Sequence, residues 1–217
     1  MPRALKAILG VLLLPLCIGG ISALSRVLVA SGSAIHFWVA FAAGAACWIS
    51  IYLLLPKPMW VYVFGHELTH VVWTWVFGGK VKRFRVSSRG GHVLITKSNS
   101  LIALAPYFFP IYAVMVVGVY TAGHLIWGWA AYAIWFHLLL GAAYAFHVTL
   151  TFKALETEQS DITGQGFFFS AVVIVLGNVA VLLLLLPLVT GVGVLTSMTW
   201  WMRDTGAFLH RLALLLR

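Results

Sequence analysis

The longest charge-free stretch of the sequence is the feature that most constrains the fold. Between Lys97 and Lys153 there is no Asp, Glu, Lys or Arg. Because a helix needs about 20 apolar residues to cross a bilayer, this stretch has room for two crossings. Over the whole chain only 9% of the residues are charged, whereas soluble domains carry about 25%. The composition therefore excludes a soluble globular domain, a disordered tail and a nucleic-acid-binding module.

Six apolar segments have the length expected of membrane-spanning helices. They cover residues 5–29, 34–55, 58–79, 101–120, 125–152 and 163–189, with a break between the fourth and fifth at 121–124. The first segment begins like a secretory signal but stays apolar through Leu28, and we interpret it as a retained anchor. We therefore predict an all-α polytopic membrane protein with about six transmembrane helices, forming a single membrane-embedded domain over residues 1–217.

Two segments differ from these apolar helices. Residues 80–97 contain two β-prone runs around Gly90 and Gly91, which predicts a small membrane-associated β-hairpin with its turn at the glycine pair. Residues 196–217 mix aromatic and leucine side chains with charged ones. This pattern is typical of an amphipathic helix that lies in the membrane interface.

The predicted hairpin also concentrates positive charge. Its six basic residues are Lys80, Lys82, Arg83, Arg85, Arg89 and Lys97. The positive-inside rule places such a cluster in the cytoplasm, which puts the N-terminus outside because three predicted spans come before it. With a net charge of +9 in so apolar a chain, we expect an anionic lipid surface, and not nucleic acid, as the partner of the hairpin.

Glu67 is the only acidic residue inside a predicted span. An ionisable group there costs at least about 2.5 kcal/mol, which makes it a candidate for function. It lies in the motif His66-Glu67-Leu68-Thr69-His70. Two histidines four residues apart share one helix face and can bind one metal ion, and the adjacent glutamate can act as a general base toward water. The alternative is a purely structural role, with two histidines that form hydrogen bonds between helices beside a buried, protonated glutamate.

The third metal ligand is open from the residues alone. Asp161, just before the last predicted span, is the first choice, although a carboxylate there can also cap the helix. His147 is the second choice, either as a ligand or as a group that stabilises an oxyanion, a role open to Asn178 as well. His137 lies ten residues earlier on the same predicted helix, about 15 Å away, so it cannot share an ion with His147.

These residues resemble the site-2 protease class of intramembrane zinc metalloproteases, the peptidase M50 group. The resemblance is carried by the motif at 66–70, by Phe-Gly-Gly-Lys-Val-Lys-Arg-Phe at 77–84, and by Ser160-Asp161. It covers residues 58–185 and implies a Zn²⁺ ion held by His66, His70 and Asp161, with Glu67 as the catalytic residue. The sequence has Asp161-Ile162 where the family usually has Asp-Gly, which indicates a divergent branch.

The resemblance implies hydrolysis of a peptide bond within or near a transmembrane segment of a membrane-protein substrate. Such a substrate helix must unwind first, because its backbone groups are paired internally. The hairpin edge can hold the unwound segment by strand addition, or the hairpin can serve only as a basic clamp on lipid. The alternative function is that of a non-proteolytic metal-binding membrane protein, either a transporter or an inactive relative. A transporter should have charged residues in several spans, and this chain has one such glutamate.

Overall fold

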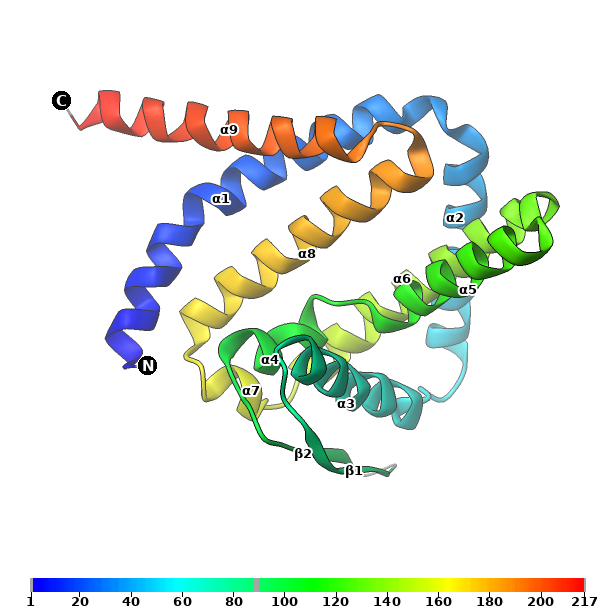
Figure 1. The fold of residues 1–217 in the computed structure, drawn as a ribbon, viewed down its shortest axis with the longest axis horizontal. Coiled ribbons are helices and arrows are strands. Elements are labelled where there is room, and N and C mark those ends of the chain that lie inside the picture. The colour runs from blue at the N-terminus through cyan, green and yellow to red at the C-terminus, as the bar shows by residue number, and fades with distance from the viewer. Residues whose placement is uncertain (1, 88–89, 217) are drawn as a thin grey trace. The chain divides into compact units, whose positions relative to one another are not determined.

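The computed structural model describes residues 2–87 and 90–216, and it is mostly helical with one two-stranded sheet (Figure 1). In chain order the elements are α1 (Arg3–Ala30), η1 (Ser31–Ser33), α2 (Ile35–Leu54), α3 (Met59–Val76), β1 (Val81–Ser87), β2 (Gly90–Ile95), α4 (Ser100–Leu104), η2 (Ala105–Tyr107), α5 (Ile111–Trp127), η3 (Trp129–Tyr132), α6 (Ala133–Leu155), α7 (Ser160–Thr163), α8 (Phe167–Thr190) and α9 (Val194–Leu215). The predicted combination of apolar helices with one small hairpin is therefore confirmed.

By length and composition, the described residues contain four helices able to cross a membrane, and up to five if a bent pair counts as one span. The four are α1, α2, α6 and α8, with α1 extended by η1 and α6 preceded by η3. The bent pair joins Ser100–Tyr107 to Ile111–Trp127 at 81°. The predicted third span does form a helix, α3, but it is not among these candidates, since two histidines and a glutamate lower its hydropathy. Its crossing of the membrane stays a prediction.

The predicted break at 121–124 is wrong. The helix α5 continues through these residues and ends at Gly128, which adopts the left-handed conformation with φ of +69°. Glycine is the residue best able to close a helix in this way. The real interruption of the fourth predicted span comes earlier, between η2 and Pro110, where the chain bends before α5 begins.

The chain forms two compact units: a terminal unit made of Met1–Ile35 with Ser160–Arg217, and a central unit made of His36–Gln159. In the terminal unit, α1 packs against both α8 and α9. A Cβ atom on Gly19 of α1 would collide with Thr205 of α9, so the two backbones approach closely. The indole of Trp201 also donates to the Leu16 carbonyl over 2.8 Å. The apolar N-terminal segment is therefore a helix packed within this unit, and its role as a retained anchor stays a prediction.

An ion pair also joins α1 and α9. Asp204 of α9 accepts from Arg26 Nε over 2.9 Å and from the hydroxyl of Ser22 over 2.6 Å. The predicted amphipathic helix at 196–217 thus exists as α9, and its first half is held on α1. Its location in a membrane interface stays a prediction.

In the central unit, α2 and α6 cross at a pair of glycines. A Cβ on Gly44 would collide with the carbonyl of Leu138, and a Cβ on Gly141 would collide with the carbonyl of Phe41. Small residues at such crossings let apolar helices pack by close van der Waals contact where water supplies no hydrophobic driving force.

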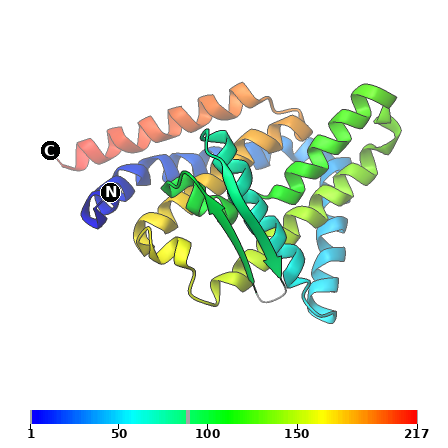
Figure 2. The ribbon, with the colours of Figure 1, turned by 60° about the horizontal axis from the view of Figure 1, so that its bottom comes forward.

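The hairpin lies along α3, as Figure 2 shows. Its strands are antiparallel, with Ser87 opposite Gly90 and Val81 opposite Ile95. The predicted turn at Gly90-Gly91 is wrong, because both glycines are already part of β2. Arg89, one of the six predicted basic residues, lies outside the described residues.

Candidate metal centre

The two histidines of the motif lie side by side on α3, as the spacing predicts. Their ring centres are 5.0 Å apart and the ring planes meet at 77°. Two imidazoles that bind one tetrahedral zinc through bonds of about 2.0–2.1 Å have ring centres roughly 5 Å apart. The helix between them is regular, and the buried hydroxyl of Thr69 donates to the Gly65 carbonyl over 2.8 Å. The pair therefore fits a shared divalent ion without rearrangement of the helix.

His70 is oriented by a backbone carbonyl from α4. Its Nδ1 lies 2.9 Å from the carbonyl oxygen of Ile102. A carbonyl can only accept, so Nδ1 is the donor, and in the neutral ring this tautomer leaves the lone pair on Nε2. Histidine ligands of metals characteristically donate their second ring N–H to such an acceptor, which fixes the tautomer and the ring orientation.

Ile102, whose carbonyl accepts from His70, is itself held by a helix cap. Asn99 precedes α4 and accepts the backbone N–H of Ile102 through its side chain over 2.8 Å. This bond fixes the peptide groups of the first turn of a helix that is only five residues long. Asn99 thus supports His70 indirectly, through the backbone of Ile102.

His66 is packed between aromatic rings. The ring of Tyr107 stands edge-on to it at 5.4 Å, and the ring of Tyr62 lies at 5.9 Å. One residue before His66, a Cβ on Gly65 would collide with the ring of Tyr112. The hydroxyl of Tyr112 donates to the Val61 carbonyl over 2.6 Å, which holds this ring against α3.

His147 of α6 shares a small cavity with His66. The cavity measures about 10 Å³ and is also lined by Tyr62, Thr69 and Tyr112. This is close to the smallest volume that holds one water molecule. His147 itself is buried, with 7% of its surface exposed. The structure thus places this predicted residue beside the first histidine of the motif, on the face of α3 that Tyr107 and Tyr112 cover.

Glu67 lies on a different side of α3, under the hairpin. Only 9% of its surface is exposed. A Cβ atom on Gly91 of β2 would lie 2.6 Å from Oε1 of Glu67, so the strand passes directly over the carboxylate. Nearby, the rings of Phe64 and Phe84 meet edge-on at 5.8 Å and hold β1 on the same helix. The hairpin is therefore a wall of the candidate centre.

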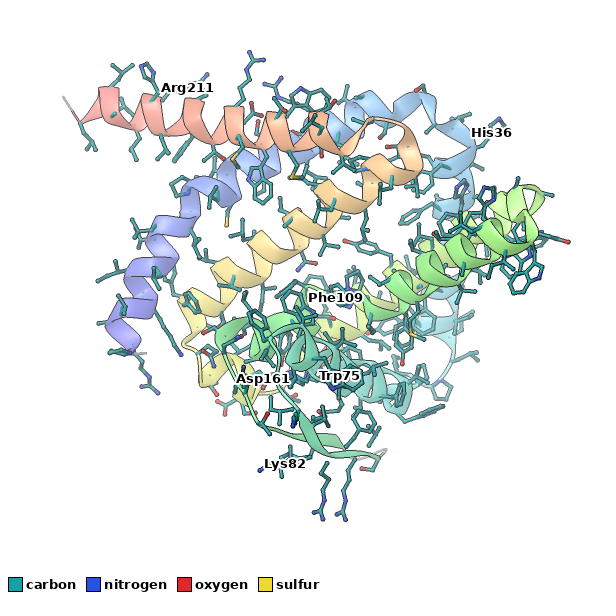
Figure 3. All side chains as sticks on the ribbon, in the orientation of Figure 1. His36, Trp75, Lys82, Phe109, Asp161 and Arg211 are labelled. Atoms are coloured by element: carbon teal, nitrogen blue, oxygen red, sulfur yellow. The ribbon has the colours of Figure 1, made fainter. Side chains whose placement is uncertain are left out.

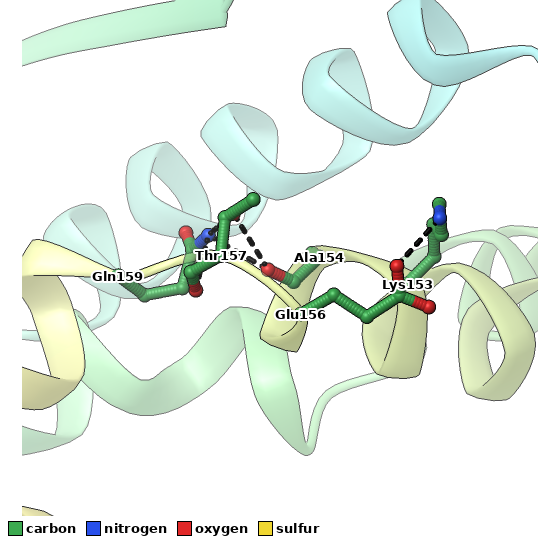
Figure 4. Close-up of polar contacts among 5 residues, drawn as sticks. All are labelled: Lys153, Ala154, Glu156, Thr157 and Gln159. Atoms are coloured by element: carbon green, nitrogen blue, oxygen red, sulfur yellow. Dashed lines mark hydrogen bonds and ion pairs between the residues drawn. The ribbon is translucent and has the colours of Figure 1, made fainter.

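The chain that leads to Asp161 is anchored in the central unit up to Gln159. The side-chain amide of Gln159 donates to the Ala154 carbonyl and to Thr157 Oγ1, each over 2.9 Å (Figure 4). Its Oε1 lies 3.4 Å from the hydroxyl of Tyr107, the ring that packs on His66. Because Asp161 comes two residues later, covalent geometry keeps its Cα within about 7 Å of the Cα of Gln159.

Asp161 itself belongs to the short helix α7, where Figure 3 labels it. Within the terminal unit, the buried hydroxyl of Ser170 donates to the Ile162 carbonyl over 3.2 Å. Lys6 of α1 donates to Gln165 Oε1 over 2.7 Å, and only 8% of its surface is exposed. The segment that carries the aspartate is thus fastened on its C-terminal side as well.

Three further polar side chains, those of Glu156, His137 and Asn178, have structural contacts. Glu156 forms an ion pair with Lys153 (Figure 4). His137 packs edge-on against Phe37 of α2, at 5.1 Å between ring centres. The amide of Asn178 donates to the Ile174 carbonyl over 2.9 Å within α8. These contacts tie each side chain to a structural neighbour.

Sequence reasoning did not identify three groups at this centre: the Ile102 carbonyl, the ring of Tyr107 and the backbone of Gly91. The run Ser98-Asn99-Ser100 before an apolar segment is a recognisable helix start and could have identified Asn99. No sequence signal marks the three groups themselves, because each lies 24 or more positions along the chain from the motif residue that it contacts.

Comparison with protein-family models, with curated proteins and with solved structures finds no match to this chain. The assignment of a function therefore depends on the chemistry of these residues.

Proposed function

We propose that this protein is an intramembrane zinc metalloprotease of the site-2 protease type, in which His66, His70 and Asp161 hold the ion. Two imidazoles and a carboxylate are a donor set that could hold a metal ion. This set matches the three protein ligands of many zinc hydrolases. The observation that carries the proposal is the Nδ1 bond of His70 to the Ile102 carbonyl, because it presents Nε2 of that ring for coordination.

The protein's own groups divide the remaining work. Zinc, when bound, supplies Lewis acidity that polarises a carbonyl and lowers the pKa of water. Glu67 accepts the proton of the attacking water and passes it to the leaving amine, which is general base and then general acid catalysis. The hairpin strand over this carboxylate leaves only 9% of the Glu67 surface exposed. His147, in the cavity beside His66, is the candidate for a further ligand or for an N–H donor to the oxyanion.

The position of the hairpin supports a substrate with an unwound backbone. A two-stranded sheet has an open edge on each strand, and β2 passes over Glu67. A peptide segment added to this sheet would run beside the carboxylate. A membrane helix offers such a segment only after local unwinding, because its backbone groups are otherwise paired.

The test compares cleavage of a model membrane substrate by the purified protein and by the Glu67→Gln variant. We expect cleavage to fall by about 10²- to 10⁴-fold, the usual contribution of a general base. The zinc content should be unchanged, since Glu67 is not a proposed ligand. Glu156→Gln is the matched control, because this carboxylate is exposed and forms an ion pair with Lys153.

Equal cleavage by wild type and Glu67→Gln would overturn the proposal. Bound zinc without cleavage, together with zinc flux into proteoliposomes, would instead favour the alternative of a metal-binding transporter. Bound zinc with neither activity would favour an inactive relative.

A further inference from the structure

The register of the hairpin separates its side chains into two faces. Directly opposite residues of antiparallel strands point to the same side of the sheet. Phe84 pairs with Val93, and Val86 pairs with Gly91. Phe84 touches Phe64 of α3 and Gly91 lies against Glu67. These four positions therefore form the inner face of the hairpin, toward α3.

The outer face is basic. Arg83 pairs with Leu94, and Arg85 pairs with His92, so these four side chains point away from α3. All four are exposed. Lys82, at the irregularity in the register, is exposed as well and lies on the hairpin in Figure 3. Two guanidiniums, an imidazole and an ammonium group are thus gathered on a strip of two short strands.

The sequence provides little negative charge to neutralise this strip. From Leu68 to Leu155 there is no Asp or Glu. Glu67 is buried on the other side of the hairpin, and Glu156 pairs with Lys153. A concentration of positive charge without local acids attracts anions from outside the chain.

Exposed apolar residues adjoin the basic strip. Trp75, Val76 and Phe77 lie four to six residues before β1 in the chain and are 59%, 71% and 37% exposed. Leu94, directly opposite Arg83 on the outer face, is 47% exposed. Tryptophan and other aromatic side chains gather at the headgroup level of bilayers, with basic residues beside them. A nucleic acid or an acidic protein would match the charge and leave this apolar surface in water.

We propose that the outer face of the hairpin is a docking surface for anionic phospholipid, in which Arg83 and Arg85 bind the headgroup phosphates. Guanidinium forks bind phosphate oxygens in pairs, and His92 adds a further donor. Trp75, Phe77 and Leu94 insert among the upper acyl carbons. One hairpin thus binds the lipid surface with its outer face and covers Glu67 with its inner face. This proposal does not depend on proteolytic activity.

The experiment titrates short-chain phosphatidylglycerol into the full-length protein in detergent and measures bound lipid by native mass spectrometry. Phosphatidylcholine of the same chain length is the neutral comparison. We expect phosphatidylglycerol to bind more tightly. Replacing both arginines, Arg83→Gln with Arg85→Gln, should weaken it by about tenfold or more, because each basic residue contributes about 1 kcal/mol at an anionic surface.

The matched control removes two exposed charges elsewhere, Arg203→Gln with Arg211→Gln on α9, and should leave the affinity within about twofold. The variant Arg83→Lys with Arg85→Lys keeps the charge and should recover the part of the affinity that depends on charge alone, which separates loss of charge from loss of folding. Hydrogen exchange of residues 81–87 and 90–95 localises the site, since bound lipid should slow exchange there.

Four outcomes would overturn the proposal. The first is equal affinity for the two lipids, and the second is equal loss in the α9 control. The third is equal protection of the hairpin by inorganic phosphate alone, which would make the surface a general anion site. The fourth is stronger protection by a polyglutamate peptide or an RNA oligonucleotide, which would indicate a macromolecular partner.

Discussion

Gly91 of the hairpin lies against the carboxylate of Glu67, so closely that a Cβ at position 91 would stand 2.6 Å from Oε1. The two residues are on different elements and 24 positions apart. Their contact makes the strand β2 a wall over the proposed general base. It also means that the smallest possible side chain at position 91 is a condition for the observed packing.

Gly91→Ala should therefore lower cleavage by about tenfold to a hundredfold, since small displacements of catalytic groups have effects of this size. The added methyl group must displace either the carboxylate or the strand. Zinc content should not change, because neither residue is a proposed ligand. Gly118→Ala on α5 is the control: a Cβ there meets no atom within 4 Å, and alanine favours helix. Unchanged cleavage by Gly91→Ala would show that the position of β2 over Glu67 does not matter for the reaction.

The support of His70 by α4 leads to a second prediction. Asn99→Ala removes the cap that holds the Ile102 backbone, and we expect zinc affinity to fall by about tenfold, at the lower end of outer-shell effects. Asn99→Asp retains a capping oxygen and should restore the affinity. Competition with a zinc-binding dye gives the affinities directly. If Asn99→Ala and wild type hold zinc equally, the carbonyl of Ile102 does not need this cap to orient His70.

The identity of the third ligand is decided by a pair of variants. Asp161→Asn should lose most of its bound zinc, because an amide oxygen is a much weaker donor than a carboxylate. His147→Ala should keep the ion and lose only part of the cleavage activity. Metal analysis after dialysis separates the two. The reverse result, with zinc kept by Asp161→Asn and lost by His147→Ala, would make His147 the ligand.

The glycine crossing of α2 and α6 predicts an effect on stability alone. Gly141→Val adds a Cβ that would collide with the Phe41 carbonyl, together with two methyl groups, and we expect a loss of about 1–3 kcal/mol, as for an overpacked core. Thermal unfolding in detergent measures the change, with Gly118→Val as the comparison on an open helix face. A variant as stable as this comparison would mean that the close approach of the two helices contributes nothing measurable.

The prediction of helices succeeded where local composition was sufficient. The segment predicted at 34–55 is α2, Ile35–Leu54, because a helix pairs all the backbone groups of a long apolar run within the segment itself. The spacing of His66 and His70 likewise predicted their shared face, because the helical repeat alone sets it. The prediction of a break at 121–124 was wrong because local composition was not sufficient there. Thr121 and Gly123 are compatible with helix, and the left-handed Gly128 gives a stronger stop.

The amino-acid sequence by itself determined the apolar helices, the basic hairpin and the shared helix face of His66 and His70, because each depends on neighbours within a turn or two. Only the tertiary structure decided that the Ile102 carbonyl orients His70, that His147 shares a cavity with His66, and that Gly91 covers Glu67. These contacts join residues 24 to 81 positions apart. The path of the chain between such residues follows from the packing of all the intervening elements, which no local pattern specifies.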